Sequence, residues 1–178
     1  MRVVTYTLRR STRARYMRLT VQPGGTAVLT VPHRVPEYMI EKFLAQHTEW
    51  IERGIKRMKD FKPLPVSGRR SYLKHKEEAR AFITERVAYW NRFYGFEHGR
   101  IAIKNTKHLW GSCSRKGNLN FSYALLFLPR ELADYVVVHE LSHLKEHNHG
   151  PRFWESVAKA LPDWKSHRRE LRKYLPRQ

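Results

Sequence analysis

Residues 136–150, VVVHELSHLKEHNHG, decide the expected fold, because an apolar run leads directly into four of the chain's ten histidines. The valines predict a buried helix, and the histidines predict either a metal site or a histidine-rich helix end. His139, Glu140 and His143 form the pattern H-E-x-x-H, and positions i and i+4 share one face of a helix. Glu140 flanks that face as a candidate general base. We expect a metal site, since unpaired polar groups in a core are costly.

The third ligand is less certain from spacing alone, since a catalytic zinc usually has three protein ligands and one open position. His147 is the next step of four, yet it lies about 12 Å beyond His139 along an unbroken helix. His149 is favoured, because Asn148 and Gly150 beside it tolerate a tight reversal of the chain. The remaining alternatives are Glu146 and Glu155.

The spacing of His139, His143 and His149 also matches the metzincin pattern. That pattern has a glycine where this chain has Glu146, and it needs a methionine turn downstream. All four methionines lie upstream of the motif. The chain is therefore not expected to be a metzincin.

Composition predicts a folded, basic protein. The 178 residues suit one domain, or a domain with a small appendage. Lysine and arginine number 35 against 16 acidic residues, a net charge of +19, and the first acidic residue is Glu37. Such a field attracts polyanions, so nucleic acid is a candidate partner. One cysteine, Cys113, permits no disulfide within the chain, and no stretch reaches the roughly 20 apolar residues of a membrane span. We expect a cytoplasmic protein without a membrane partner.

Hydrophobic periodicity predicts an α+β protein with an N-terminal antiparallel β-meander and a helical C-terminal third. The expected meander strands are 3–8, 16–21 and 26–32, followed by a helix over about 36–58. A linker or loop rich in proline covers 61–70, so the domains are expected at 1–60 and 71–178, unless the whole chain is one continuous domain. The expected elements of the second part are a helix over 71–94, extended stretches within 101–114 and 119–128, and helices over 130–146, 151–161 and from about 163.

Three segments resemble the YgjP-like metallopeptidase family, a relative of the SprT-like zincins. They are WGSCSRKGNLNFSYALLFLP (110–129), DYVVVHELSHLKEHNHGPRFW (134–154) and, more loosely, LAQHTEWIERGI (44–55). The resemblance implies a zincin-like metallopeptidase core in which His139, His143 and His149 hold Zn²⁺ and Glu140 is the general base. One departure is His108-Leu109, which stands where a basic residue is expected near Trp110.

The resemblance also implies a strand alongside the metal helix, whose edge pairs with a peptide substrate. Trp110, Gly111, Ser112 and Cys113 are the substrate-binding candidates, and the small residues permit close backbone approach. A buried tryptophan beside a tight turn is the alternative interpretation. Cys113 is either an inert buried thiol or a fourth zinc ligand.

Further side chains near the motif have less specific predictions. The candidates to stabilise an oxyanion are Tyr123, Tyr135 and His108. Phe153, Trp154, Val157 and Leu161 follow helical spacing, and we expect them to pack against the turn that holds His149. The C-terminal sequence SHRRELRKYL predicts a basic amphipathic helix with a solvated face or a phosphate-binding face.

The expected function is a zinc-dependent hydrolase, most simply a peptidase that uses water activated by Glu140. The alternatives are a nucleic-acid-binding module with a structural zinc and a protease acting on DNA-associated proteins. The presence of Glu140 favours an enzyme, because a structural zinc site has no need of a base beside its ligands.

Overall fold

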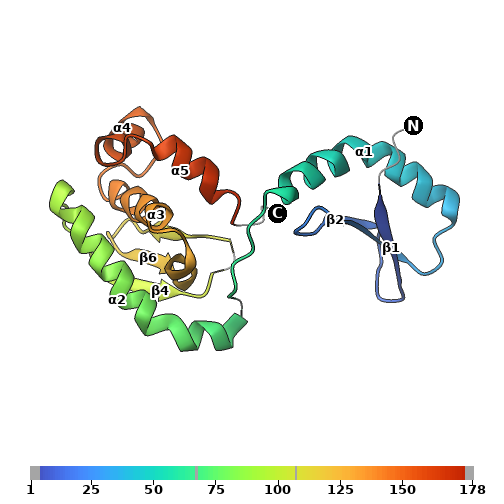
Figure 1. Cartoon of the computed structure of the whole chain (residues 1–178), viewed down its shortest axis with the longest axis horizontal. Helices are drawn as coiled ribbons and strands as arrows, with labels where there is room; N and C mark the ends of the chain where they lie inside the picture. The colour runs from blue at the N-terminus through green and yellow to red at the C-terminus, as the bar shows by residue number, and fades with distance from the viewer. Residues whose placement is uncertain (1–4, 67, 107, 175–178) are drawn as a thin grey trace. The chain divides into compact units, whose positions relative to one another are not determined.

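The computed structural model describes residues 5–66, 68–106 and 108–174. Contacts divide the chain into two compact units, Met1–Pro63 (the N-terminal unit) and Leu64–Gln178 (the C-terminal unit). Both combine helices with a three-stranded sheet, so the α+β class is confirmed (Figure 1). No helix within the described ranges is long and apolar enough to cross a membrane.

The N-terminal unit consists of a sheet and one helix. Strands β1 (Tyr6–Ser11), β2 (Arg18–Val21) and β3 (Ala27–Pro32) are followed by α1 (Glu37–Lys59). Gly54 lets α1 approach the sheet, because a Cβ there would lie 2.7 Å from Cγ2 of Val21. The buried cluster is small, and its fully buried members are Leu29, Val31 and Ile40.

The expected antiparallel meander is wrong. β2 and β3 form an antiparallel hairpin, but β1 pairs with the other edge of β3 in a parallel direction, in the order β1-β3-β2. The segment 12–17 is long enough to carry the chain across the sheet instead of turning back tightly. Alternation placed β2 and β3 correctly, but the first strand was expected at 3–8 and is found at Tyr6–Ser11, with residues 3 and 4 outside the described residues. Alternation also carries no information on which edge each strand pairs with.

The C-terminal unit begins with the long helix α2 (Gly68–Tyr94), which Gly95 ends at a positive φ of 64°. Its sheet has the order β4-β6-β5, from β4 (Ile101–Lys104), β5 (Gly111–Cys113) and β6 (Leu119–Ser122). β4 runs parallel to β6 and β5 antiparallel to it. β5 is therefore an edge strand among the described residues.

Four helical segments follow this sheet: the 3₁₀ helix η1 (Tyr123–Phe127), α3 (Arg130–Ser142), α4 (Pro151–Ala160) and α5 (Trp164–Leu171). The extended stretch expected over 119–128 is thus wrong beyond Ser122, whose hydroxyl accepts the backbone N–H of Ala124 and caps η1. The continuous apolar run there contains no alternation to mark the change.

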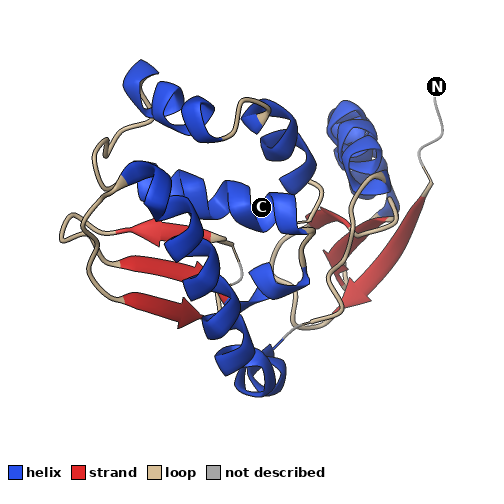
Figure 2. Ribbon diagram, turned by 60° about the vertical axis from the view of Figure 1, so that its left-hand side comes forward, coloured by secondary structure: helices blue, strands red, loops and turns tan. Residues whose placement is uncertain are grey.

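Helix α3 lies at the centre of the C-terminal unit. It contacts α2, β5, α4 and α5, and Figures 1 and 2 show it across the sheet. Ten of its thirteen residues are buried. Arg86 of α2 holds Asp134 of α3 through two hydrogen bonds, Nε–Oδ1 at 2.6 Å and Nη2–Oδ2 at 2.9 Å. Both side chains are nearly buried, so this pair ties the metal-motif helix to its neighbour.

Candidate metal centre

Three histidines converge at the C-terminal end of α3. His139 lies on the last turns of the helix, His143 is its C-cap residue, and His149 lies in the loop before α4. One ring nitrogen from each lies within 4.8 Å of the others. The Nε2 atoms of His139 and His149 are 3.1 Å apart, close to the spacing of two nitrogens around one ion at about 2.1 Å.

The geometry depends on an early end to α3. The helix was expected to continue to 146, but it ends at Ser142, and turn hydrogen bonds from Leu144 and Lys145 reverse the chain. Gly150 has an ordinary φ of −76°, so no special glycine conformation is needed to return His149. The alternatives Glu146, His147 and Glu155 do not belong to the cluster of potential ligands in the described chain.

Aromatic packing holds the three imidazoles in place. The Phe153 ring, which is fully buried, has its centre 4.9, 4.4 and 4.7 Å from those of His139, His143 and His149. Trp154 adds contacts at 6.0 Å to His139 and 5.7 Å to His149. The prediction that residues of α4 pack against the returning turn is therefore confirmed for these two rings.

The lowered pKa values of His139 and His143 suit cation binding. Burial lowers the pKa of His139 to about 3, with a smaller contribution from the charges of neighbouring groups, and burial also lowers the pKa of His143. Neutral imidazole is the form that binds metal. His143 Nδ1 lies 3.0 Å from the carbonyl oxygen of Glu146, so Nδ1 carries the proton and Nε2 is left for a ligand.

Glu140 is buried beside these histidines with little to compensate its charge. It is 5% exposed, burial raises its pKa to about 8, and its Oε2 makes no hydrogen bond to the described chain. The buried Nδ1 of His139 likewise lacks a partner there. Three imidazole nitrogens and an unsatisfied carboxylate oxygen fit a divalent cation with its water better than they fit a purely structural core.

Gly111 of β5 makes room for Glu140. A Cβ at Gly111 would lie 2.6 Å from Cγ and 2.7 Å from Oε1 of Glu140, closer than real Cβ contacts. The absence of a side chain therefore lets the edge strand run directly beside the carboxylate. Close approach was predicted here from the small residues, and its partner is the glutamate itself.

The other three substrate-binding candidates have different surroundings. Trp110 is half-buried against the core, and Ser112 is exposed and accepts a hydrogen bond of 3.2 Å from Nδ2 of Asn120. Burial, and secondarily the charge of Glu140, raises the pKa of the half-buried Cys113 thiol. Cys113 does not join the potential ligand cluster among the described residues. A pocket of about 290 Å³ lies along β5 and β6, and its lining includes Trp110, Gly111, Ser112 and Lys104.

Among the three oxyanion candidates, Tyr135 has a ring contact with a histidine of the cluster in the described part of the chain. Its ring centre is 6.0 Å from that of His139. Tyr123 packs instead against Tyr72 and Phe127, and His108 is exposed.

Arg168 of α5 was not singled out from the sequence. Burial is the main cause that lowers the pKa of His139, and the charge of Arg168 adds to that lowering. Burial raises the pKa of Tyr135, and the charge of Arg168 opposes that rise. The only available signal was the basic character of the C-terminal helix, which does not distinguish one arginine from another.

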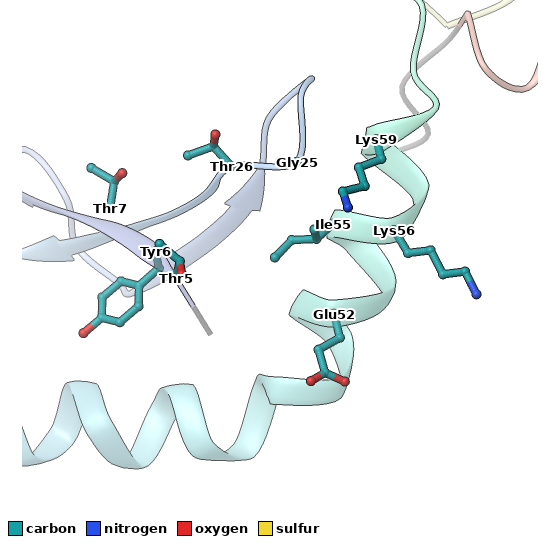
Figure 3. Close-up of a pocket in the computed structure, with 9 residues that line it drawn as sticks. All are labelled: Thr5, Tyr6, Thr7, Gly25, Thr26, Glu52, Ile55, Lys56 and Lys59. Atoms are coloured by element: carbon teal, nitrogen blue, oxygen red, sulfur yellow. The ribbon is translucent and has the colours of Figure 1, made fainter. Parts of the chain in front are cut away.

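The N-terminal unit has a pocket of its own, of about 510 Å³, between its sheet and α1 (Figure 3). Ile55 points toward the strands and Lys56 points away from them. No group of three potential metal ligands lies in this unit among the described residues. Threonines and two lysines dominate the lining, so the chemistry of a hydrolytic site is concentrated at the histidines of the C-terminal unit.

The class of protein follows from comparison with known families: the chain is a metal-dependent hydrolase of the metallopeptidase type. It belongs to the YgjP-like metallopeptidase family, whose domain matches residues 15–75 and 70–174. None of the curated proteins matches the sequence.

Two solved structures of metallopeptidase zymogens are similar to about half of this chain. The zymogen of abylysin from Pyrococcus abyssi is 25% identical, covering 50% of this chain and 90% of that one, with a TM-score of 0.47. The zymogen of jannalysin from Methanocaldococcus jannaschii is 22% identical, covering 50% of this chain and 92% of that one, with a TM-score of 0.45. The family assignment rests on the domain match and not on these two structures.

Proposed function

We propose that this protein is a zinc metallopeptidase with a zincin-like core, in which His139, His143 and His149 bind the metal and Glu140 is the general base. The observation that carries the proposal is the cluster itself: three imidazole nitrogens within 4.8 Å of one another, beside a buried carboxylate. Three nitrogen ligands that leave one position open are typical of catalytic zinc.

The proposed chemistry divides between the metal and the chain. Zinc would polarise the scissile carbonyl and lower the pKa of a water molecule. Glu140 would take the proton from the attacking water on a carboxylate oxygen and pass it to the leaving amine. Its burial and its raised pKa suit this exchange, because a base that titrates near neutrality both accepts and releases a proton.

Strand β5 is the proposed binding edge for the substrate. Its partner β6 lies on one side only, so its outer backbone groups can pair with an extended peptide. Trp110, Gly111, Ser112 and Cys113 would line this edge. Gly111 keeps it within reach of Glu140, so peptide pairing there would bring a carbonyl to the base.

Two substitutions test the proposal. Glu140→Gln should keep zinc, measured by elemental analysis, but lower the rate of casein cleavage by about 10²–10⁴-fold through loss of the base. The wild type should contain close to one zinc ion per protein, and His149→Ala should lose most of it. His147→Ala, at a residue outside the cluster, should retain the zinc. Unchanged cleavage by Glu140→Gln, or full zinc content in His149→Ala, would contradict the assignment.

A second candidate function, contact with nucleic acid, is favoured by one face of the N-terminal sheet. Arg9 of β1 and Arg18 of β2 both pair in register with Thr30 of β3, so all three lie in one row on the same face. Both arginines are exposed, and no carboxylate precedes Glu37. Exposed arginine side chains and a hydroxyl on one face are the groups that contact phosphate oxygens of nucleic acid. The same contact would serve a protease acting on DNA-associated proteins.

Salt dependence tests this second function. Binding of a fluorescent single-stranded oligonucleotide should weaken with salt, and Arg9→Gln with Arg18→Gln should reduce the log–log slope by about 0.7 per arginine. Arg53→Gln on α1 is a matched loss of charge that should leave the slope nearly unchanged. An equal effect from Arg53→Gln would mean that net charge alone drives binding.

A further inference from the structure

Arg168 lies beside the candidate metal centre in an aromatic setting. Its guanidinium carbon is 5.0 Å from the ring centre of Trp154, within the range of a cation–π interaction. The Trp154 ring in turn stacks on Trp164, with centres 4.1 Å apart and planes inclined by 12°. Two stacked indoles on α4 and α5 thus form a rigid platform for this arginine.

The platform brings the guanidinium close to the histidines. The ring centres of Trp154 and His149 are 5.7 Å apart, so the guanidinium carbon lies at most about 11 Å from the imidazole of His149. An extended peptide advances about 3.3 Å per residue. The guanidinium therefore lies no more than the length of about three to four extended residues from the imidazole of His149.

The charge of Arg168 is open to a ligand. The residue is exposed, and none of the ion pairs between described residues includes it. A guanidinium presents donors in a planar fork that matches the two oxygens of a carboxylate, and it is less strongly hydrated than an ammonium group. The guanidinium of Arg86, by contrast, already donates two hydrogen bonds to the carboxylate of Asp134.

We propose that Arg168 is a specificity residue of this centre: its guanidinium, held on Trp154, binds a substrate carboxylate a few residues from the scissile bond. The inference rests on the proposed peptidase function and narrows its substrates to peptides with an anionic group near the cleaved bond. The carboxylate has two sources, an acidic side chain or the C-terminus of the peptide. The basic chain would also draw such peptides in.

A binding experiment separates the two sources. The zinc-loaded Glu140→Gln variant is titrated calorimetrically with three short alanine-based peptides. One has a central Glu and an amidated C-terminus, one a central Gln and an amidated C-terminus, and one a central Gln and a free C-terminus. We expect at least one carboxylate-bearing peptide to bind about tenfold more tightly than the neutral one.

Variants of two adjacent arginines supply the control. Arg168→Met, added to Glu140→Gln, should abolish the preference for a carboxylate, while Arg169→Met removes the same charge from the same helix and should preserve it. Equal binding of all three peptides, or an equal loss with Arg169→Met, overturns the proposal.

Cleavage by the otherwise unaltered enzyme gives a second readout. In a proteome-derived peptide mixture, Arg168→Met should lower kcat/KM for acidic or C-terminal sites relative to kcat/KM for neutral sites. An equal fall in kcat/KM for every site would overturn the proposal, because it indicates a role in the transition state instead. A protein that binds carboxylates through Arg168 and yet cleaves nothing would contradict the peptidase and not the carboxylate site.

Discussion

The two units differ in whether they bury charged and polar side chains. All the buried charged or polar side chains among the described residues lie in the C-terminal unit, including Arg86, Asp134 and Glu140. The N-terminal unit buries only apolar side chains around its small cluster and leaves its charges in water. A buried charge needs a large surrounding core and a partner or ligand to compensate it. The larger core of the C-terminal unit therefore suits a reactive site with buried charges, and the small core of the N-terminal unit does not.

Two arginines offer the sharpest contrast between the units. Arg86→Met leaves the carboxylate of Asp134 nearly buried without its partner, and should destabilise the C-terminal unit by about 3–5 kcal/mol. Arg10→Met removes two hydrogen bonds from an exposed side chain to the carbonyls of His33 and Val35, and should cost about 1 kcal/mol.

Urea unfolding measures both changes. A Trp50→Phe background leaves the other four tryptophans, all in the C-terminal unit, as fluorescent reporters. Backbone circular dichroism follows the N-terminal unit as well. Equal losses of unfolding free energy for the two substitutions would show that burial does not set the cost of removing an arginine.

Two glycines make the second contrast, because each lies where a Cβ would meet a side chain. Gly111→Ala should push Glu140 away from its position and lower kcat/KM about a hundredfold, as expected when a general base is displaced. Gly54→Ala meets only Val21 and should lower stability without changing kcat/KM. Peptide cleavage and thermal unfolding of both variants are compared. Full activity in Gly111→Ala would show that β5 does not constrain the base.

The third effect is a pH dependence specific to the C-terminal unit. The pKa of Glu140 is raised by burial to about 8, so the folded metal-free protein holds a proton that the unfolded chain has lost. Its contribution is fully present below the unfolded pKa near 4.5 and is lost as pH rises through 8. In the presence of chelator, the free energy of unfolding of the wild type should therefore fall between about pH 5 and pH 8. The fall should exceed that of Glu140→Gln by at least about 1 kcal/mol.

Thermal unfolding of both proteins in chelator at several pH values checks this. The lowered pKa values of His139 and His143 act on the acid side, where their contribution is lost as pH falls below 6.5. Both proteins share them, so they cancel in the difference. A difference that stays constant with pH would mean that Glu140 is hydrated in the folded protein.

Much of the helical structure could be predicted, because the signals for a helix lie within the residues that form it. Proline and glycine signals placed α1, α2 and α4 to within a few residues, and hydrophobic spacing marked their buried faces. Pairing between strands could not be predicted, as the parallel contact of β1 with β3 shows. Strand pairing depends on contacts between distant residues, on which local patterns carry no information.

Sequence alone determined the composition of the candidate site and the helix beneath it, because H-E-x-x-H places two imidazoles on one helical face by the helical repeat itself. The membership of His149 was a preference on sequence grounds. Only the tertiary structure decided that α3 stops at Ser142, that Phe153 contacts all three imidazoles, and that Gly111 clears a place for Glu140. It alone brought Arg168 to the same place, because side chains from separate elements meet only when the core packs.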